Sequence, residues 1–483
     1  MSVNRYSTVL IPGNDCLLDT KKSKVKLSNR IKLLRRTLRE RTALAKLVKE
    51  LRTSDMQLLY EEGSVKTKQD IVDTMASLVM ACPNLEKLTG FHLTYDHEFD
   101  RLTHALSTRK NLKEHVWLIK GTGYNWEKWD FDDYYYDGCP SVPGPPEPDT
   151  FLQFHDSWRT LQTLVLHGDG AGSLDYRSFI GTFRRLPALK NLIVSHFTSD
   201  DFNDRTLQAV PALHSLRLED LPGLTDKGLL RFATSQAAKE LRSLSLIDLE
   251  IMFLPVLSKF LANLGSLKSF TLVQDASPGL PRGAVISKPF KSQSLEFMHW
   301  DVLIPGTANE ALASSIEAGA FPNLRKIRAP SDHQGLLQDL CRPVAEITRD
   351  SDRFMGNPAL ENDMRYLRSL SAARRAAQER IERARRMPAM KIVVEDEGIV
   401  QHVYTVKSFM GKLGSQIEYS LEPDIEGSHN AVAGVLEATR ENVVTVAERT
   451  CNGSWNEKHP EGRTWWHHTP RGCTRTVPLK RIL

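Results

Sequence analysis

The sequence is poor in cysteine, and its six cysteines form no Cys-x-x-Cys pair. This excludes a disulfide-rich scaffold and predicts free thiols in a reducing compartment. The sequence also lacks an apolar run of about 18 residues and a secretory leader, so we expect a soluble protein of the cytoplasm or nucleus that does not bind membranes. A strong excess of one charge is missing too, because the net charge is only +5 over 483 residues. Nucleic acid is therefore a disfavoured partner.

Motifs that carry catalysis are absent as well: there is no Gly-x-Ser-x-Gly, no His-Glu-x-x-His and no phosphate-binding loop. The glycine-rich stretch 168–172 matches a dinucleotide loop only in part, and we interpret it as the turn that leaves a strand. Cysteines and histidines near the end of the sequence have gaps that match no closed zinc site: Cys451, His459, His467, His468 and Cys473. We therefore expect a non-enzymatic protein with no catalytic residue, metal or cofactor.

What the sequence does contain is a repeated unit of a leucine, two variable residues, an apolar residue, one variable residue and a second apolar residue. Clear copies begin at Leu161, Leu189, Leu213, Leu241 and Leu267, and weaker copies begin at Leu85, Leu112, Leu295 and Leu324. From Leu161 onward the first leucines are separated by 28, 24, 28, 26, 28 and 29 residues, within the range of leucine-rich repeats. The pattern predicts an α/β leucine-rich-repeat solenoid, a curved parallel sheet with helices on its convex side. An ordinary α/β domain with accidental spacing is the rival interpretation.

In such a solenoid each Leu-x-Leu stretch is a short parallel strand with its leucines pointing inward. The intervening residues then form a concave surface, which suits a protein or peptide ligand better than a phosphate backbone, because no dense basic stripe is present. Many of them could equally serve only to solvate the sheet. The predicted concave-face residues are His167, Asn191, Ser195, Ser215, Arg217, Glu219, Ser243, Ser245, Ser269, Thr271, His299, Asp301, Lys326 and Arg328.

The regions around the repeats divide the chain further. Residues 1–60 are predicted to form an N-terminal cap, with a basic amphipathic helix over 21–52 that could also act as a nuclear-localisation patch. The solenoid is predicted over 61–345, followed by a charged helix or linker over 346–390. Residues 391–483 are predicted to hold a small β-meander of the segments 391–395, 399–406 and 415–421, and a tail rich in tryptophan and histidine.

An insertion of aromatic, acidic and proline residues interrupts the repeats over 121–157. It could pack back on the solenoid or contact a basic ligand. The residues predicted to make such contacts are Trp126, Trp129, Tyr134 and Tyr135.

The stretch from Leu224 to Leu229 and the Pro-Asn-Leu and Pro-Ala-Leu strand starts resemble the repeat region of F-box proteins, specifically the large filamentous-fungal group. Further stretches also resemble that family: 6–12, 34–38, 47–51, 452–456 and 465–466. The resemblance implies a substrate-recognition subunit of a cullin-type ubiquitin ligase in ubiquitin-dependent protein degradation, with the repeats binding the substrate and the F-box binding the adaptor subunit. The F-box module, with its opening Leu-Pro dipeptide, is not visible in this sequence. A free-standing leucine-rich scaffold with no ligase role is the alternative.

Overall fold

The structure of the chain is a computed structural model. It describes residues 7–11, 27–53, 56–61, 63–121, 148–281, 290–304, 306–329, 331–332, 334–342, 390–396, 398–406, 411–412, 414–420, 443–448 and 471–476. Three predicted features lie outside these stretches: the insertion contacts Trp126, Trp129, Tyr134 and Tyr135, most of the charged helix or linker, and the tail of tryptophans and histidines.

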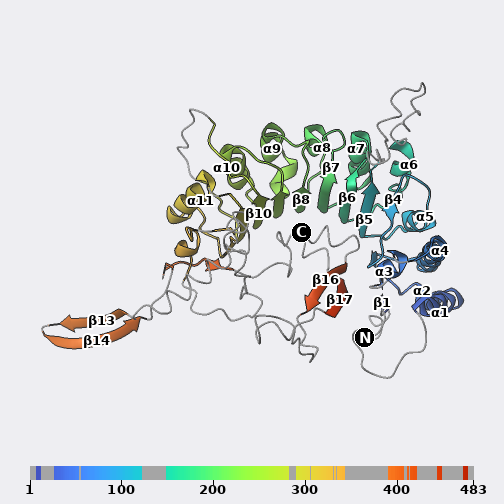
Figure 1. Cartoon of the computed structure of the whole chain (residues 1–483), viewed down its shortest axis with the longest axis horizontal. Coiled ribbons are helices and arrows are strands. Elements are labelled where there is room, and N and C mark those ends of the chain that lie inside the picture. Colours follow the sequence, from blue (N-terminus) through green and yellow to red (C-terminus); the bar gives the residue numbers. More distant parts are fainter. Residues whose placement is uncertain are drawn as a thin grey trace, which may run out of the picture.

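Ten strands form one large sheet, and each hydrogen-bonded pair of neighbours is parallel. In spatial order they are β15 (Glu418–Tyr419), β12 (Lys326–Arg328), β11 (Phe297–Val302), β10 (Ser269–Gln274), β9 (Ser243–Ile247), β8 (Ser215–Glu219), β7 (Asn191–Phe197), β6 (Thr163–Gly172), β5 (Glu114–Lys120) and β4 (Thr94–Tyr95). The sheet is curved, with helices along its outer side (Figure 1). This arrangement confirms the predicted leucine-rich-repeat solenoid.

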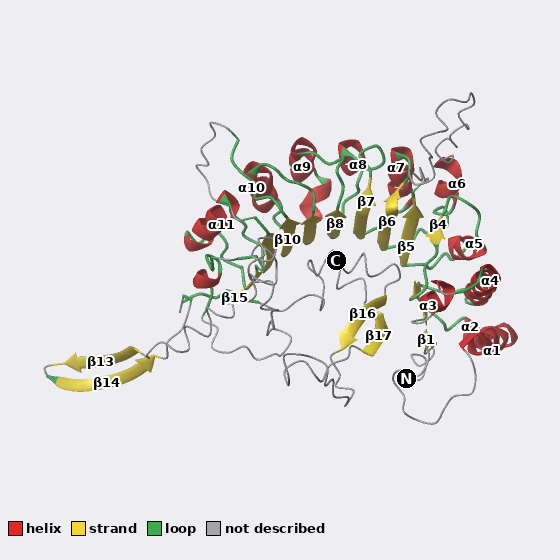
Figure 2. Cartoon of the chain, in the orientation of Figure 1, coloured by secondary structure: helices red, strands yellow, loops and turns green. Residues whose placement is uncertain are grey.

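Short helices connect the strands and cover the convex face (Figure 2). They are α5 (Arg101–Ser107), α6 (Pro148–Gln153), α7 (Tyr176–Arg185), α8 (Asp204–Gln208), α9 (Asp226–Ala233), α10 (Leu254–Asn263) and α11 (Thr307–Glu317), with 3₁₀ turns η4 (Ala237–Glu240) and η5 (Gln338–Leu340). Several begin at a side-chain cap. Asp100 accepts a hydrogen bond from the Thr103 amide, and Thr225 accepts one from the Gly228 amide, which satisfies helix-end donors that have no backbone partner.

The core lies between the sheet and these helices, and the repeated leucines build it. The core-facing leucines and valine of the central strands are at most 1% exposed: Leu164, Leu166, Leu192, Val194, Leu216, Leu218, Leu244, Leu246 and Leu272. Each buried leucine contributes about 2 kcal/mol of hydrophobic free energy relative to an exposed one. Proline precedes several strands, as at Pro187, Pro211 and Pro322, where the chain leaves a helix.

The glycine-rich stretch 168–172 differs from its prediction as a turn. Strand β6 continues through it to Gly172, with an irregular pairing to β7 after His167. A Cβ atom on Gly168 would lie 2.0 Å from the carbonyl oxygen of His196. Glycine is therefore needed here for the close approach of two backbones.

The N-terminal region adds a separate sheet of three parallel strands, β1 (Thr8–Leu10), β2 (Glu50–Arg52) and β3 (Lys87–Thr89). Its helices are α1 (Leu27–Glu40), α2 (Thr42–Ala45), α3 (Met56–Glu61) and α4 (Val65–Ala81). The predicted basic helix is correct over α1 but wrong at its end, where the chain enters β2. The reason is tertiary: Leu51 is fully buried and pairs in register with Leu88.

The C-terminal region corrects the predicted meander. Strand β13 (Met390–Asp396) pairs antiparallel with β14 (Ile399–Val406), and β16 (Val443–Glu448) pairs with β17 (Arg471–Thr476). The third predicted segment joins the large sheet instead, where β15 pairs parallel with β12. The Tyr419 hydroxyl donates a hydrogen bond to the Ala329 carbonyl at 2.8 Å, which fixes this end strand.

None of the described helices is long and apolar enough to cross a membrane.

Candidate functional site

The concave face carries three rows of side chains that run across the strands, because equivalent positions of successive parallel strands lie side by side. The first row contains Asn191, Ser215, Ser243, Ser269, Phe297 and Lys326. The second row contains Arg217, Ser245, Thr271, His299 and Arg328. The third row contains His167, Ser195, Glu219, Ile247, Val273 and Asp301. The structure thus brings every predicted concave-face residue onto one surface, and their role in binding stays a prediction.

Apolar side chains that sequence reasoning missed extend the second and third rows. They are Val116, Leu118, Val165, Ile193, Ile247 and Val273. All six are buried, yet they belong to the face opposite the leucine core. The repeat pattern treats these positions as variable, and the available signal was the unbroken apolar runs 164–166 and 192–194. The concave face is therefore most apolar at β5, and β6, β7, β9 and β10 each carry one apolar residue beside two polar ones.

The exposure of the second row differs from the prediction of solvent-facing side chains. Arg217 is fully buried, and Ser245, Thr271, His299 and Arg328 are at most 7% exposed. These residues form a packed polar layer and not a loosely solvated one.

A charge pair lies at the centre of this layer. The Nε and Nη2 atoms of Arg217 both donate to Oε2 of Glu219, at 3.0 and 2.6 Å. Nδ1 of His196 lies 2.8 Å from Oδ2 of Asp220, and its Nε2 lies 4.0 Å from Oε1 of Glu219. Because both members of the pair are buried, removing either one should be destabilising. The positive charge of Arg217 and the negative charge of Glu219 are therefore fixed at this point of the concave face.

Beside this pair, His167 Nδ1 lies 2.8 Å from the Ser195 hydroxyl oxygen. A serine and a histidine at this distance are two components of a hydrolase triad. Among the residues that the structure describes, however, the nearby carboxylate of Asp220 is bonded to a different histidine, His196. These residues do not assemble into a Ser-His-Asp triad.

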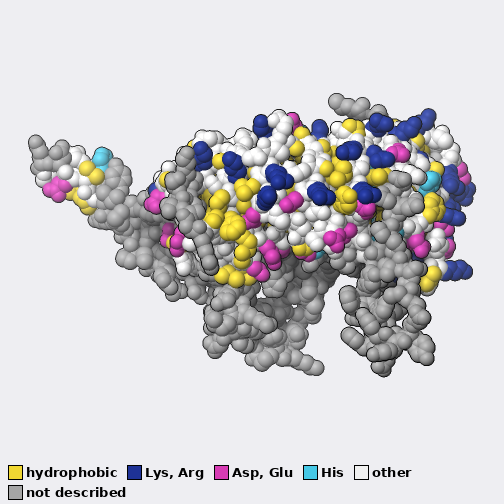
Figure 3. Space-filling model, turned by 90° about the horizontal axis from the view of Figure 1, so that it is seen from above, with side chains coloured by type: hydrophobic (Ala, Val, Ile, Leu, Met, Phe, Trp, Pro, Cys, Tyr) yellow, Lys and Arg dark blue, Asp and Glu magenta, His cyan; other side chains and the backbone are white. Residues whose placement is uncertain are grey.

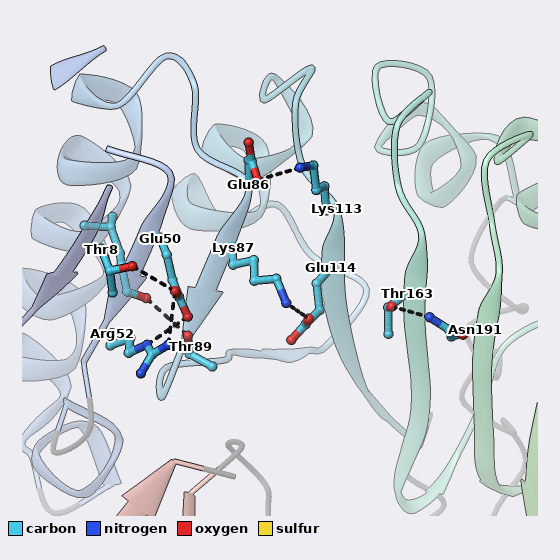
Figure 4. Close-up of polar contacts among 11 residues, drawn as sticks. Thr8, Glu50, Arg52, Glu86, Lys87, Thr89, Lys113, Glu114, Thr163 and Asn191 are labelled. Carbon is cyan, nitrogen blue, oxygen red and sulfur yellow. Dashed lines mark hydrogen bonds and ion pairs between the residues drawn. The ribbon is translucent and has the colours of Figure 1, made fainter. Parts of the chain in front are cut away.

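Polar contacts continue the first row toward the N-terminus (Figure 4). The Thr8 hydroxyl donates to Glu50 at 3.2 Å, and Asn191 Nδ2 donates to the Thr163 hydroxyl at 3.0 Å. Between them, the ammonium group of Lys87 on β3 pairs with the Glu114 carboxylate on β5. Strands β3 and β5 belong to different sheets, so this contact joins the two sheets across a seam.

A second ion pair crosses the same seam. Lys113 Nζ lies 2.7 Å from Oε2 of Glu86 (Figure 4), and the Lys113 amide donates to the Glu86 carbonyl at 2.8 Å. Glu86 also pairs with Lys49 at 3.1 Å. The lysines hold the pKa of the Glu86 carboxyl below its usual value, although partial burial opposes them. These ion pairs thus reinforce the backbone hydrogen bond that links the two sheets at this junction.

Buried histidines near β5 belong to the core and not to a site. Burial lowers the pKa of His155 to about 3 and that of His92 to about 4. Nε2 of His155 accepts from the Trp117 indole at 3.2 Å while its Nδ1 donates to the Phe151 carbonyl at 3.0 Å. Both ring nitrogens of the neutral imidazole are satisfied, so this side chain has a structural role.

The described residues contain no group of three or more His, Cys, Asp or Glu that could hold a metal ion. The two described free thiols, Cys82 and Cys341, are buried, and burial raises the pKa of each to about 12. A thiol with such a pKa is a poor nucleophile. The candidate ligands Cys451, His459, His467 and His468 lie outside the described residues, as does the side chain of Cys473.

Neither protein-family models nor curated proteins match this chain. Solved structures do. One is the leucine-rich repeat-containing protein LegL7 from Legionella pneumophila, at 16% identity and a TM-score of 0.34, covering 68% of this chain and 95% of that one. Another is the complex of Rad7 and Elc1 in yeast, at 14% identity and a TM-score of 0.31, covering 62% of this chain and 83% of that one. The assignment of the fold rests on the parallel sheet and the repeats of the chain itself.

Proposed function

We propose that this protein is a non-enzymatic interaction module whose concave face binds a protein partner. The observation that carries this proposal is the continuous surface of three side-chain rows across β5 to β12. An extended, curved surface of this kind fits a polypeptide, whereas small molecules require a concave pocket that encloses most of their area. The second and third rows are largely buried, so the half-buried side chains of the first row would contact the partner: Asn191, Ser243, Ser269, Phe297 and Lys326.

Within this function, we propose that the chain is a substrate-recognition subunit of a cullin-type ubiquitin ligase in the cytoplasm or nucleus. Its sequence resemblance to F-box proteins supports this, and the geometry of the concave face is compatible with it. The concave face would bind the substrate, and a different surface would bind the adaptor subunit.

The test is a purification of the tagged full-length chain from the cells that express it, with quantitative mass spectrometry of the partners. One variant places arginine on the concave first row, as Ser243→Arg with Ser269→Arg, where both serines are half-buried. The control places arginine on the convex helix α11, as Ser314→Arg at an exposed position. We expect the concave variant to lose a substrate protein that the control retains, while adaptor and cullin remain with both. Depletion of the chain should raise the abundance of that substrate.

Two outcomes would change the conclusion. If a partner depends on the concave face but adaptor and cullin are never recovered, the chain is a free-standing scaffold. If the concave variant keeps every partner, the concave face is not the binding surface.

A further inference from the structure

A second surface lies at the edge of the solenoid where the strands end. Exposed carboxylates follow three successive strands: Asp220 after β8, Asp248 and Glu250 after β9, and Asp275 after β10. We call these four residues the acidic edge. Figure 3, which views the molecule from above, shows Asp and Glu gathered mainly toward the lower edge of the view and Lys and Arg toward the upper half. The charges of the repeats are therefore segregated.

Large apolar side chains are exposed along the same edge. Met252 is 60% exposed, Phe253 42%, Leu280 40% and Ile304 42%. Backbone hydrogen bonds place their loops next to one another, since the Gly279 amide donates to the Met252 carbonyl at 2.9 Å. The Ile304 amide likewise donates to the carbonyl of Asp275 at 2.8 Å. Acidic and exposed apolar side chains thus lie on neighbouring loops of this edge.

The two kinds of side chain meet in a recess of about 360 Å³, whose lining includes Asp220, Asp226, Asp248, Glu250, Met252 and Phe253. Its volume is at the lower end of the range for ligand pockets, about 300 to 1,000 Å³. A recess of this size accommodates one or two side chains of a partner.

Of the four carboxylates of the acidic edge, Asp220 contacts His196, but contacts within the described chain do not account for the other three. Nearby Asp204 has a clear structural role, because it accepts hydrogen bonds from the Thr225 amide and hydroxyl at 2.9 and 2.6 Å. In contrast, Asp248, Glu250 and Asp275 form no ion pair among the described residues. The buried Oδ2 atom of Asp226, in the wall of the recess, has no hydrogen-bond partner in the described chain either. An unsatisfied buried oxygen is costly and is explained if a donor enters the recess.

Electrostatics points the same way. Partial burial, followed by the charges of Glu219, Asp275, Asp220 and Asp301, raises the pKa of Asp248 to about 6. When these carboxylates are ionised, their negative charges therefore repel one another. A cation that entered the recess would relieve this repulsion, and a neutral ligand would not.

We propose that the acidic edge, with its exposed apolar side chains, binds an extended segment of a partner protein in which arginine or lysine alternates with large apolar residues. The basic side chain enters the recess between Asp226 and Asp248, and the apolar residues pack on Met252, Phe253, Leu280 and Ile304. This surface is distinct from the concave face and does not require that the concave face bind a partner.

The test uses the full-length chain and a short fluorescein-labelled peptide in which arginine alternates with leucine, measured by fluorescence anisotropy. The variant is Asp248→Asn with Glu250→Gln, and the charge-matched control is Glu240→Gln with Glu317→Gln, two exposed carboxylates elsewhere. We expect the edge variant to weaken peptide binding about tenfold and the control to leave it unchanged. The Met252→Ser variant should weaken binding without changing its dependence on salt.

The design separates binding from folding, because neutralising the edge relieves repulsion and should not unfold the protein. A peptide with glutamate in place of arginine should not bind, and added salt should weaken the binding of the native chain. The concave variant Ser243→Arg with Ser269→Arg should bind the basic peptide normally, so failure of one surface does not imply failure of the other. Equal binding by the native chain and the edge variant, or no binding at low salt, would overturn the proposal.

Discussion

Replacing Asp248 with asparagine should stabilise this protein, and the structure gives the size of the effect. The rise of the pKa of Asp248 from 3.8 to about 6 corresponds to about 3 kcal/mol if it were fully felt. The residue is exposed even though its carboxyl is partly enclosed by the recess, so solvent screening reduces the gain to about 1 kcal/mol. Asparagine also tolerates the left-handed backbone at this position, where φ is 49°.

The sign of the pH dependence follows from linkage. The pKa of Asp248 is higher in the folded state than in the unfolded state, so the folded state binds the proton more tightly. The stability that this protonation contributes is fully present below about pH 4 and is lost as the pH rises through about 6. The Asp248→Asn variant should therefore exceed the native chain in stability at about pH 7.5 and match it near pH 4. Urea unfolding followed by circular dichroism across this range measures the difference, and Glu317→Gln controls for net charge. Equal stability at both ends, or a loss at neutral pH, would refute the reasoning.

Three further changes test the core and the helix caps, each measured as the free energy of unfolding in urea. Leu244→Ala should destabilise the chain by about 3 kcal/mol, because the leucine is fully buried and leaves a cavity; a cost below about 1 kcal/mol would contradict the assigned register. Gly228→Ala should cost about 1 to 3 kcal/mol, since its Cβ would lie 1.8 Å from an Asp204 carboxylate oxygen, whereas Gly265→Ala, with open space around it, should be nearly neutral. The pKa of His155 is lowered to about 3, so its imidazole stays neutral in the folded state, while the unfolded chain takes up a proton below about pH 6.5. The free energy of unfolding should therefore fall as the pH is lowered from about 6.5 to 4. A His155→Gln variant should lose less stability over that interval.

The repeats were predictable because one residue type recurs at one spacing. Leucine at alternate strand positions defines which face is buried, and the structure places Leu164, Leu192, Leu216 and Leu244 side by side in register. The concave rows follow from the same register, so the membership of the candidate surface was accessible from the sequence. The chemistry of this surface was harder to predict. The repeat pattern does not indicate that Ile193 is buried or that Arg217 pairs with Glu219 on the same strand.

The errors have tertiary causes. The residues of strand β2 belong to a sequence pattern that predicts a helix. They are extended because Leu51 is buried and pairs with Leu88 on the neighbouring strand β3. Strand β15 has two residues, too few for periodicity to signal, and it is held by contacts such as that from Tyr419 to Ala329. The acidic edge was visible in principle, because aspartate directly follows three strands, but its meaning requires knowing that those strands are neighbours.

We expect the seam between β3 and β5, where one sheet ends and the next begins, to separate two cooperative units of the solenoid. In an array of repeats each unit contacts only its neighbours, so stability is a sum of unit and interface free energies, and the weakest interface sets where the array opens. Among the described residues, no strand ladder joins the two sheets at this junction. One backbone hydrogen bond, from the Lys113 amide to the Glu86 carbonyl, and partly exposed ion pairs, which are individually weak, link them beside the continuous apolar core. Local unfolding should therefore begin in the N-terminal unit and stop at this seam. Amide hydrogen exchange should be faster on the N-terminal side of the seam than on the C-terminal side, and added salt should accelerate it.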